Sequence, residues 1–306
     1  FILFIGVALL MNTCMATQDI ATDALAVRLL PLRWRGIGNS IQVAGYKLGM
    51  LAGGNGLLMM MAVIGWSDSF RVIAVGLLML LIPVLLFQEP APKQATFTSS
   101  FNSLGFWRDW SALFSQPATR FWLPVLLTYK LADALGSSMI KPLLIDNGFS
   151  LHVVGEVGMV SSIASLLAAF VAGLLCRWIG TWRALMYGGL LQAMGLGLYA
   201  TVALGMHQLS WIYSVSVFEQ MADAMSTVTL FAAMMGYCRA GHEGSDYTVQ
   251  MAAFTVLSGT VSLAGGATAS QAGFPLFFLG SAALGVASLY FVWQAYQQAS
   301  VKISMC

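Results

Sequence analysis

Seven ionisable side chains lie inside stretches of the sequence that are otherwise apolar. They are Asp19, Asp23, Lys47, Lys130, Asp133, Glu219 and Asp223. An Asp or Lys at the centre of a membrane helix costs about 2.5 to 3.5 kcal/mol on insertion scales, so such a residue faces a cavity or a charged partner. Charges retained inside a membrane indicate a path for a proton, an ion or a polar solute.

Two pairs of these carboxylates are spaced four residues apart, which places the members of each pair on one face of a helix. Asp19 and Asp23 form the first pair, and Glu219 and Asp223 form the second. Two carboxylates held together in a low dielectric do not both ionise readily, so one member can bind and release a proton. Asp23 has an alternative role, pairing with the arginines that follow it, whereas we expect Asp19 to face a cavity.

The two buried lysines have different surroundings in the sequence. Lys130 precedes Asp133 by three residues, so the two can pair on one helix. Lys47 has no such neighbour, and we expect it to face the central cavity, where it would neutralise Asp19 or bind an anionic group of the substrate. Snorkelling of Lys47 to the membrane surface is the alternative.

Two glutamines complete the predicted site, because Gln18 and Gln42 are close in sequence to Asp19 and Lys47. The cysteines and histidines lack the spacing of a metal site. Ser or Cys nucleophile motifs with a base are also absent. We therefore expect a transport pathway with no metal, no cofactor and no enzymatic activity; a membrane-embedded enzyme or a non-transporting sensor is the alternative class. The predicted substrate and proton pathway consists of Asp19, Asp23, Lys47, Gln18, Gln42, Lys130, Asp133, Glu219 and Asp223.

Long apolar stretches must position these side chains. Hydrophobic residues make up 58% of the 306 residues and charged residues only 8%, against roughly 25% in soluble domains. The mean hydropathy is +0.80, which predicts an all-α polytopic membrane protein. A net charge of +2 without a basic stripe argues against nucleic acid as a partner. Cutting the chain at charged or Gly/Pro-rich breaks predicts nine spans, at 1–27, 37–64, 72–88, 121–145, 155–176, 184–205, 211–236, 249–270 and 275–296.

The basic residues predict the orientation of the spans, because cytoplasmic loops hold an excess of Lys and Arg. One set of alternating loops and termini holds ten basic residues, and the other holds only Arg71 and Lys141. The C-terminus is therefore expected on the cytoplasmic side. The ten are Arg28, Arg33, Arg35, Lys93, Arg108, Arg120, Arg177, Arg183, Arg239 and Lys302.

One long loop, residues 89–120, separates three spans from six. Its residues 101–116 have the apolar spacing of an amphipathic helix lying at the membrane surface. Many transporters are built from two related halves. We therefore expect nine of twelve transmembrane helices here. Residues 1–88 would be helices four to six of a partial N-terminal half, and residues 121–306 would be the six-helix C-terminal half. A first residue that is Phe rather than Met agrees with an N-terminally truncated chain.

Several short motifs are similar to those of a known family. They are ATQDIATDA at 16–24, GYKLGM at 45–50, YKLAD at 129–133, VGEVG at 154–158 and FE at 218–219. In these motifs the chain resembles the AmpG-like permeases, which belong to the major facilitator superfamily and stand near the acetyl-CoA transporters. The resemblance implies the major facilitator superfamily fold and supports Asp19, Asp23 and Lys47 as functional positions.

The resemblance also implies a function. Its members import anhydromuropeptides, which are GlcNAc-anhydroMurNAc with an attached peptide, across the bacterial inner membrane with the proton gradient. The RhtX/FptX siderophore permeases have a similar core and are the alternative, favoured by the run DALAVR at 23–28. The expected partners are a small-molecule substrate, protons and the lipid bilayer, and the protein is expected to act as a monomer.

Overall fold

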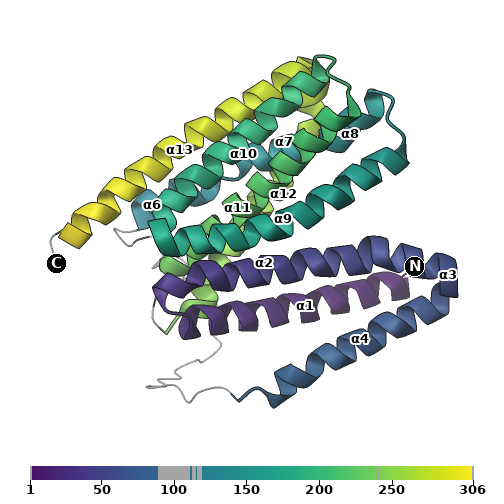
Figure 1. Ribbon diagram of the computed structural model, residues 1–306. Helices are drawn as coiled ribbons and strands as arrows, with labels where there is room; N and C mark the ends of the chain where they lie inside the picture. The colour runs from purple at the N-terminus through teal and green to yellow at the C-terminus, as the bar shows by residue number, and fades with distance from the viewer. Residues whose placement is uncertain (1, 89–110, 112–114, 116–118, 240, 305–306) are drawn as a thin grey trace. The chain divides into compact units, whose positions relative to one another are not determined.

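The computed structural model describes residues 2–88, 111, 115, 119–239 and 241–304, and the regular elements in these residues are all helical (Figure 1). Contacts between residues divide the chain into two compact units. The larger unit is Phe1–Ala44 together with Trp110–Cys306, and the smaller unit is Gly45–Asp109. The side chains that form the buried polar cluster described below all lie in the larger unit.

Long antiparallel helices dominate the larger unit, as the ribbons of α9, α10, α11 and α13 show in Figure 1. The elements in chain order are α1 (Ile2–Leu29), η1 (Leu32–Trp34), the first part of α2 (Arg35–Leu51), α6 (Thr119–Thr128), α7 (Leu131–Ser137), α8 (Ile140–Asp146), α9 (Leu151–Ile179), α10 (Thr181–Ala203), α11 (Leu209–Gly236), α12 (Glu243–Ala272) and α13 (Phe274–Ser304).

Each of the nine predicted spans is helical, which confirms the prediction of an all-α polytopic fold. Within the described residues, five helices are long and apolar enough to cross a membrane by length and composition: α4 (Trp66–Leu86), α9, α10, α12 and α13. Helices α1 and α11 are not among the five. Both carry acidic residues inside their spans, which lowers their hydropathy.

The fourth predicted span, 121–145, is interrupted twice and forms α6, α7 and α8. The second interruption has a clear cause in the sequence. Pro142 cannot donate a hydrogen bond to the carbonyl of Ser138, and its ring crowds that carbonyl. The helix therefore stops at Ser137 and starts again at Ile140. The first interruption, at Tyr129 and Lys130, has no proline beside it, and it positions a charged side chain.

The smaller unit contains the end of α2, a five-residue π-helical segment η2 (Ala52–Gly56), α3 (Leu57–Ile64) and α4 (Trp66–Leu86). The glycine-rich run AGGNG forms η2, so the second predicted span bends out of regular α-helix there. Gly65 joins α3 to α4 with φ of 80°, a backbone conformation that glycine adopts without strain. Apart from Ser111 and Ser115, the predicted amphipathic helix at 101–116 lies outside the described residues. The division into two transporter halves stays a prediction.

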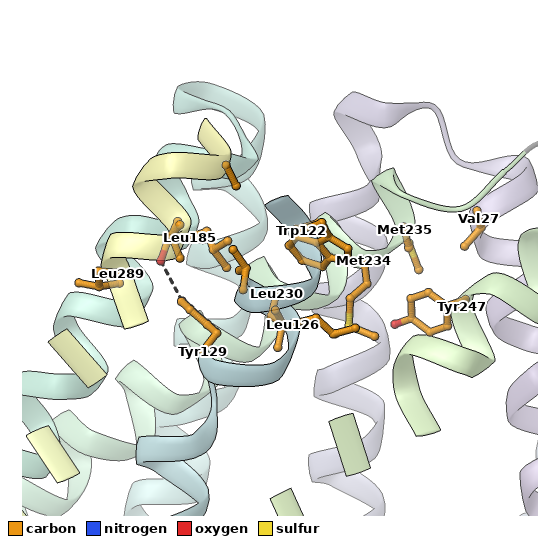
Figure 2. Packing of buried hydrophobic residues seen from close by; sticks show 14 residues of the cluster. Val27, Trp122, Leu126, Tyr129, Leu185, Leu230, Met234, Met235, Tyr247 and Leu289 are labelled. Carbon is orange, nitrogen blue, oxygen red and sulfur yellow. Dashed lines mark hydrogen bonds between the residues drawn. The ribbon is translucent and has the colours of Figure 1, made fainter. Parts of the chain in front are cut away.

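Two large apolar clusters form the core of the larger unit. The first, shown in Figure 2, joins Trp122 of α6, Leu185 of α10, Leu230 of α11 and Tyr247 of α12. The second joins Leu143 of α8 to Tyr199 of α10, Val215 of α11 and Phe278 of α13. In α10 and α11 the two clusters use opposite ends of the same helices, and polar residues occupy the positions between them.

Candidate functional site

The break between α6 and α7 positions Lys130 inside the helical bundle. Lys130 has φ of −103° and ψ of 6°, outside the geometry of a regular helix. Its side chain is only 5% exposed. Tyr129, the residue before it, donates from its hydroxyl to the carbonyl of Leu185 at 2.8 Å, the dashed line in Figure 2. This bond to α10 anchors the break next to the first apolar cluster.

Four side chains from three helices surround the ammonium group of Lys130. The Nζ atom lies 2.9 Å from Oδ2 of Asp133 and 2.7 Å from Oδ1 of Asp223. It also donates to Oε1 of Gln192 and to Oγ of Ser226, each at 3.0 Å. An ammonium group has three donors, so these contacts use its full capacity. We call these five residues the Lys130 cluster.

Further hydrogen bonds join the members of the Lys130 cluster to one another. Gln192 donates from Nε2 to Oδ1 of Asp133 at 2.6 Å, and the Ser226 hydroxyl is hydrogen-bonded to Gln192. Thr227 donates to Oδ1 of Asp223 at 3.3 Å. The side chains of Asp133 and Asp223 are 15% and 24% exposed, in contrast to 5% for Lys130. The carboxylates therefore form the accessible side of the cluster.

Glu219 lies one helical turn before Asp223 on α11 and is 1% exposed. Its Oε2 atom accepts a hydrogen bond from Nε2 of Gln220 at 3.2 Å. Its Oε1 atom is buried and has no hydrogen-bond partner among the described residues. The site therefore combines one ammonium group with three carboxyl groups, those of Asp133, Glu219 and Asp223.

The Lys130 cluster and Glu219 form a polar layer between the two apolar clusters. On α10, Gln192 lies between Leu185 and Tyr199; on α11, the polar positions 219–226 lie between Val215 and Leu230. Glu219 is ten residues from the start of α11, which corresponds to about 15 Å along the helix axis. Apolar side chains at both ends therefore enclose a charged centre.

The structure brings Asp23 and Gln42 together as well. Asp23 is 7% exposed and accepts a hydrogen bond from Nε2 of Gln42, which joins α1 to α2. The side chains of Gln18 and Asp19 are exposed on α1. Lys47 is half-buried and lies in the smaller unit. The predicted residues of the C-terminal part thus gather around Lys130, and Asp23 and Gln42 form a separate pair between α1 and α2. The roles of Gln18, Asp19 and Lys47 stay predictions.

Arg35 joins the ends of two helices at one end of the larger unit. It donates from Nη2 to the carbonyl of Val27 at 3.1 Å, from Nε to that of Leu30 at 3.3 Å, and from Nη1 to that of Met235. Val27 lies in the last turn of α1, Leu30 directly follows this helix, and Met235 lies in the last turn of α11. A cation there compensates the partial negative charge of the helix ends. We call the end of the larger unit that contains Arg35 and the C-terminal ends of α1 and α11 the basic end.

Other contacts close the basic end around Arg35. The guanidinium carbon of Arg177 lies 4.4 Å from the ring centroid of Trp34. The Ser40 hydroxyl of α2 donates to the carbonyl of Ala169 of α9 at 2.6 Å. Two glycines, Gly36 and Gly173, allow α2 and α9 to approach this closely, because a Cβ atom on either would clash with the other helix. The first part of α2 and helix α9 are therefore tightly packed at this end.

Arg239 and Asp246 fasten the short connection between α11 and α12 at the same end. The carboxylate of Asp246, 2% exposed, accepts from Nη2 of Arg239 at 2.6 Å and from Nε at 2.8 Å. Cys238 lies in this connection, and burial raises the pKa of its thiol to about 12. A thiol with so high a pKa is a poor nucleophile at neutral pH. The described residues also contain no cluster of His, Cys, Asp and Glu that could hold a metal ion.

Sequence reasoning missed three residues of these sites. Gln192 and Ser226 belong to the Lys130 cluster, and Arg35, which the sequence indicates only as a basic loop residue, binds the ends of two helices. A glutamine inside an apolar span was the available signal for Gln192. Ser226 gave no signal, because serines in membrane helices often bond to the preceding turn of their own helix.

Comparisons with known proteins agree with this architecture. The family model of the Major Facilitator Superfamily matches residues 1–262. The anhydromuropeptide permease of Escherichia coli (strain K12) is 30% identical over 299 residues, which are 93% of this chain and 58% of the permease. The putative transporter AmpG 4 of Rickettsia conorii is 24% identical over 304 residues, 94% of this chain and 71% of that protein.

The chain therefore spans 58% of the length of the first of these relatives. The relatives are named as permeases or transporters, which confirms the resemblance to the AmpG-like permeases. The siderophore alternative gains no support from them. The family model covers residues 1–262, which is most of this helical chain and includes its buried charge cluster. This chain belongs to the Major Facilitator Superfamily.

Proposed function

We propose that the protein is a secondary transporter that imports a bulky polar solute of the anhydromuropeptide class into the cytoplasm, driven by the proton gradient. The observation that carries the proposal is the Lys130 cluster with Glu219, one ammonium group and three carboxyl groups enclosed between apolar clusters. Charged groups are expensive inside a membrane bundle and mark transport paths.

The excess of acid groups supports proton coupling. Lys130 can balance one of the three nearby carboxylates, and a second negative charge is tolerated because Asp133 and Asp223 are partly exposed. The third group, Glu219, is 1% exposed and has no cation of its own on the same helix. A bound proton removes this imbalance. A site that holds a proton in one conformation and loses it in another couples transport to the proton gradient.

The substrate class rests on the relatives, one of which is named an anhydromuropeptide permease. Solutes of this class carry sugar hydroxyls and peptide carboxylates. Amide and ammonium side chains bind such groups well, and Gln18, Gln42 and Lys47 supply them on α1 and α2. We propose that Gln18 and Gln42, with Asp19 and Asp23, line one part of the path, and that Lys47 is a separate candidate position for binding an anionic group of the substrate.

The arginine-rich basic end supports the orientation. It gathers Arg28, Arg33 and Arg35 with Arg177, Arg183 and Arg239 at neighbouring helix ends. Because cytoplasmic ends of membrane helices are enriched in Arg and Lys, we place the basic end in the cytoplasm of a bacterium and the protein in its inner membrane. The C-terminus of α13 is then cytoplasmic.

Uptake by cells tests this function. The complete protein is expressed in a bacterial strain that lacks its own anhydromuropeptide permease, and the accumulation of radiolabelled anhydromuropeptide is measured with and without a protonophore. We expect accumulation that the protonophore abolishes and that Asp19→Asn lowers several-fold. Accumulation insensitive to the protonophore would contradict proton coupling. Absence of uptake by correctly inserted protein would contradict the substrate class.

A further inference from the structure

Glu219 is the most completely enclosed carboxyl group of the polar layer. It is 1% exposed, and its Oε1 atom has no hydrogen-bond partner among the described residues. Helix α10 lies directly against it, because a Cβ atom on Gly195 would be 3.2 Å from the Cβ atom of Glu219. An ionised carboxylate in such a position is costly, because burial removes its hydration and only one weak donor replaces it.

The charged groups nearby do not supply a partner for Oε1. Lys130 at the α6–α7 break already contacts Asp133, Gln192, Asp223 and Ser226, which use its three donors. Asp133 of α7 and Asp223 of α11 are carboxylates and oppose a further negative charge. On α10, the hydroxyl of Tyr199 is engaged with Ser216 at 2.8 Å. The surroundings of Glu219 therefore favour the neutral acid.

We propose that Glu219 is the residue that binds the transported proton, and that it is protonated in this conformation. Binding adds one proton to the carboxylate; release returns the proton to water on the opposite side of the membrane and leaves the carboxylate. Release requires a second conformation. In this conformation Lys130 leaves Asp223 and becomes the counter-ion of Glu219, which lies one turn from Asp223 on α11. The inference rests on the proposed proton-coupled uptake and assigns its proton site.

The alternative is that Glu219 is a structural acid with no part in coupling. Glu219→Gln distinguishes the two, because glutamine keeps the shape of a protonated glutamate but cannot release a proton. Proteoliposomes containing the complete protein are tested for exchange of labelled against unlabelled anhydromuropeptide and for accumulation driven by a pH gradient. Glu156→Gln is the matched control, since Glu156 on α9 is 48% exposed and lies outside the polar layer.

We expect Glu219→Gln to exchange substrate at a rate within a few-fold of the wild type and to lose gradient-driven accumulation. The control variant Glu156→Gln should both exchange the substrate and accumulate it, as the wild type does. Accumulation by Glu219→Gln at the wild-type level would overturn the assignment. So would a folded variant that binds substrate but has lost both exchange and accumulation, because Glu219 would then have a structural role. A wild-type protein that fails to accumulate the substrate would instead contradict the proposed function itself.

A spectroscopic measurement keeps the assignment testable if Glu219→Gln is poorly folded. Infrared spectra of the wild-type protein at neutral pH should contain the C=O stretching band of a protonated carboxylic acid. Replacement of Glu219 by Asp should shift this band, and Glu156→Gln should leave it unchanged. If the band is absent from the wild type, or if it does not respond to the substitution of Glu219, the assignment is wrong.

Discussion

Nζ of Lys130 lies 2.7 Å from Oδ1 of Asp223, although 93 residues separate them in the chain. This ion pair joins the break between α6 and α7 to the middle of α11. Lys130 also pairs with Asp133 on its own segment at 2.9 Å. The ammonium group therefore holds two helices together at the depth of the polar layer, and its removal leaves two carboxylates facing each other.

The first prediction concerns this pair. Breaking a buried ion pair by removing one partner costs about 3–5 kcal/mol, because the other charge stays buried. Lys130→Gln should therefore lower the free energy of unfolding in detergent micelles by an amount in the lower part of this range, since Asp223 is 24% exposed. Lys130→Gln combined with Asp223→Asn should recover part of the loss. Lys141→Gln, at an exposed lysine, is the control and should have no measurable effect.

The contact between α2 and α9 leads to a second prediction. A Cβ atom on Gly173 would lie 2.9 Å from the carbonyl oxygen of Gly36 and 3.0 Å from the Cα atom of Ile37, which are backbone atoms that cannot turn aside. Gly173→Ala should lower the free energy of unfolding by about 1–3 kcal/mol, as other overpacked sites do. Gly158→Ala on the same helix has no atom within 4 Å of its new Cβ and should raise stability by up to about 1 kcal/mol. Equal effects of the two substitutions would contradict the packing described.

The basic end gives a third prediction, based on α1 and α12. A Cβ atom on Gly244 would lie 2.9 Å from the Cβ atom of Ala24, shorter than the separation of about 3.5–4.5 Å found in disulfides, so a small shift of α12 away from α1 gives the geometry of a disulfide. In a variant whose native cysteines are replaced by serine, Ala24→Cys with Gly244→Cys should cross-link on oxidation and block uptake, and reductant should restore it. The pair Ala24→Cys with Gly259→Cys should not cross-link. Full uptake by the cross-linked protein would mean that the basic end does not open during transport.

Arg35 provides the fourth prediction, because it bonds to carbonyl groups of both α1 and α11. Arg35→Gln removes the charge and most of these donors. We expect the Ala24–Gly244 cysteine pair to cross-link more slowly in this variant, since the basic end spends less time closed. Arg33→Gln, at an exposed position, should leave the cross-linking rate unchanged. An unchanged rate in Arg35→Gln would show that the other contacts close this end without it.

Much of the fold follows from the sequence because a membrane helix forms its backbone hydrogen bonds within its own segment. A long apolar run satisfies its own backbone hydrogen bonds, so its length and position are visible without knowledge of its neighbours. The nine predicted spans rest on this basis; helices occupy these positions, and five of the described helices have the length and composition to cross a membrane. The pairing of Lys130 with Asp133 was predictable for the same reason, since residues three apart on a helix are neighbours. The break at Ser138 could have been found from Pro142.

The rest of the site depends on which helices are adjacent, and local patterns do not contain this information. The sequence predicts Asp223 and Glu219 on one face of α11, but it does not indicate that Lys130, at the break between α6 and α7, is the partner of Asp223. The position of Gln192 in the cluster is equally hidden in the sequence, because it lies on α10 and contacts Asp133 of α7 and Ser226 of α11. The sequence indicates only a basic loop residue at position 35, whereas the guanidinium of Arg35 binds carbonyl groups 8 and 200 residues away.

Proton movement coupled to substrate entry is the most direct test of the central claim. The complete protein is reconstituted into liposomes that contain a pH-sensitive dye, with no initial pH gradient, and anhydromuropeptide is added outside. Proton-coupled import predicts that the interior becomes more acidic as the substrate enters, and that liposomes without protein show no change. Entry of labelled substrate with no acidification of the interior would contradict the account.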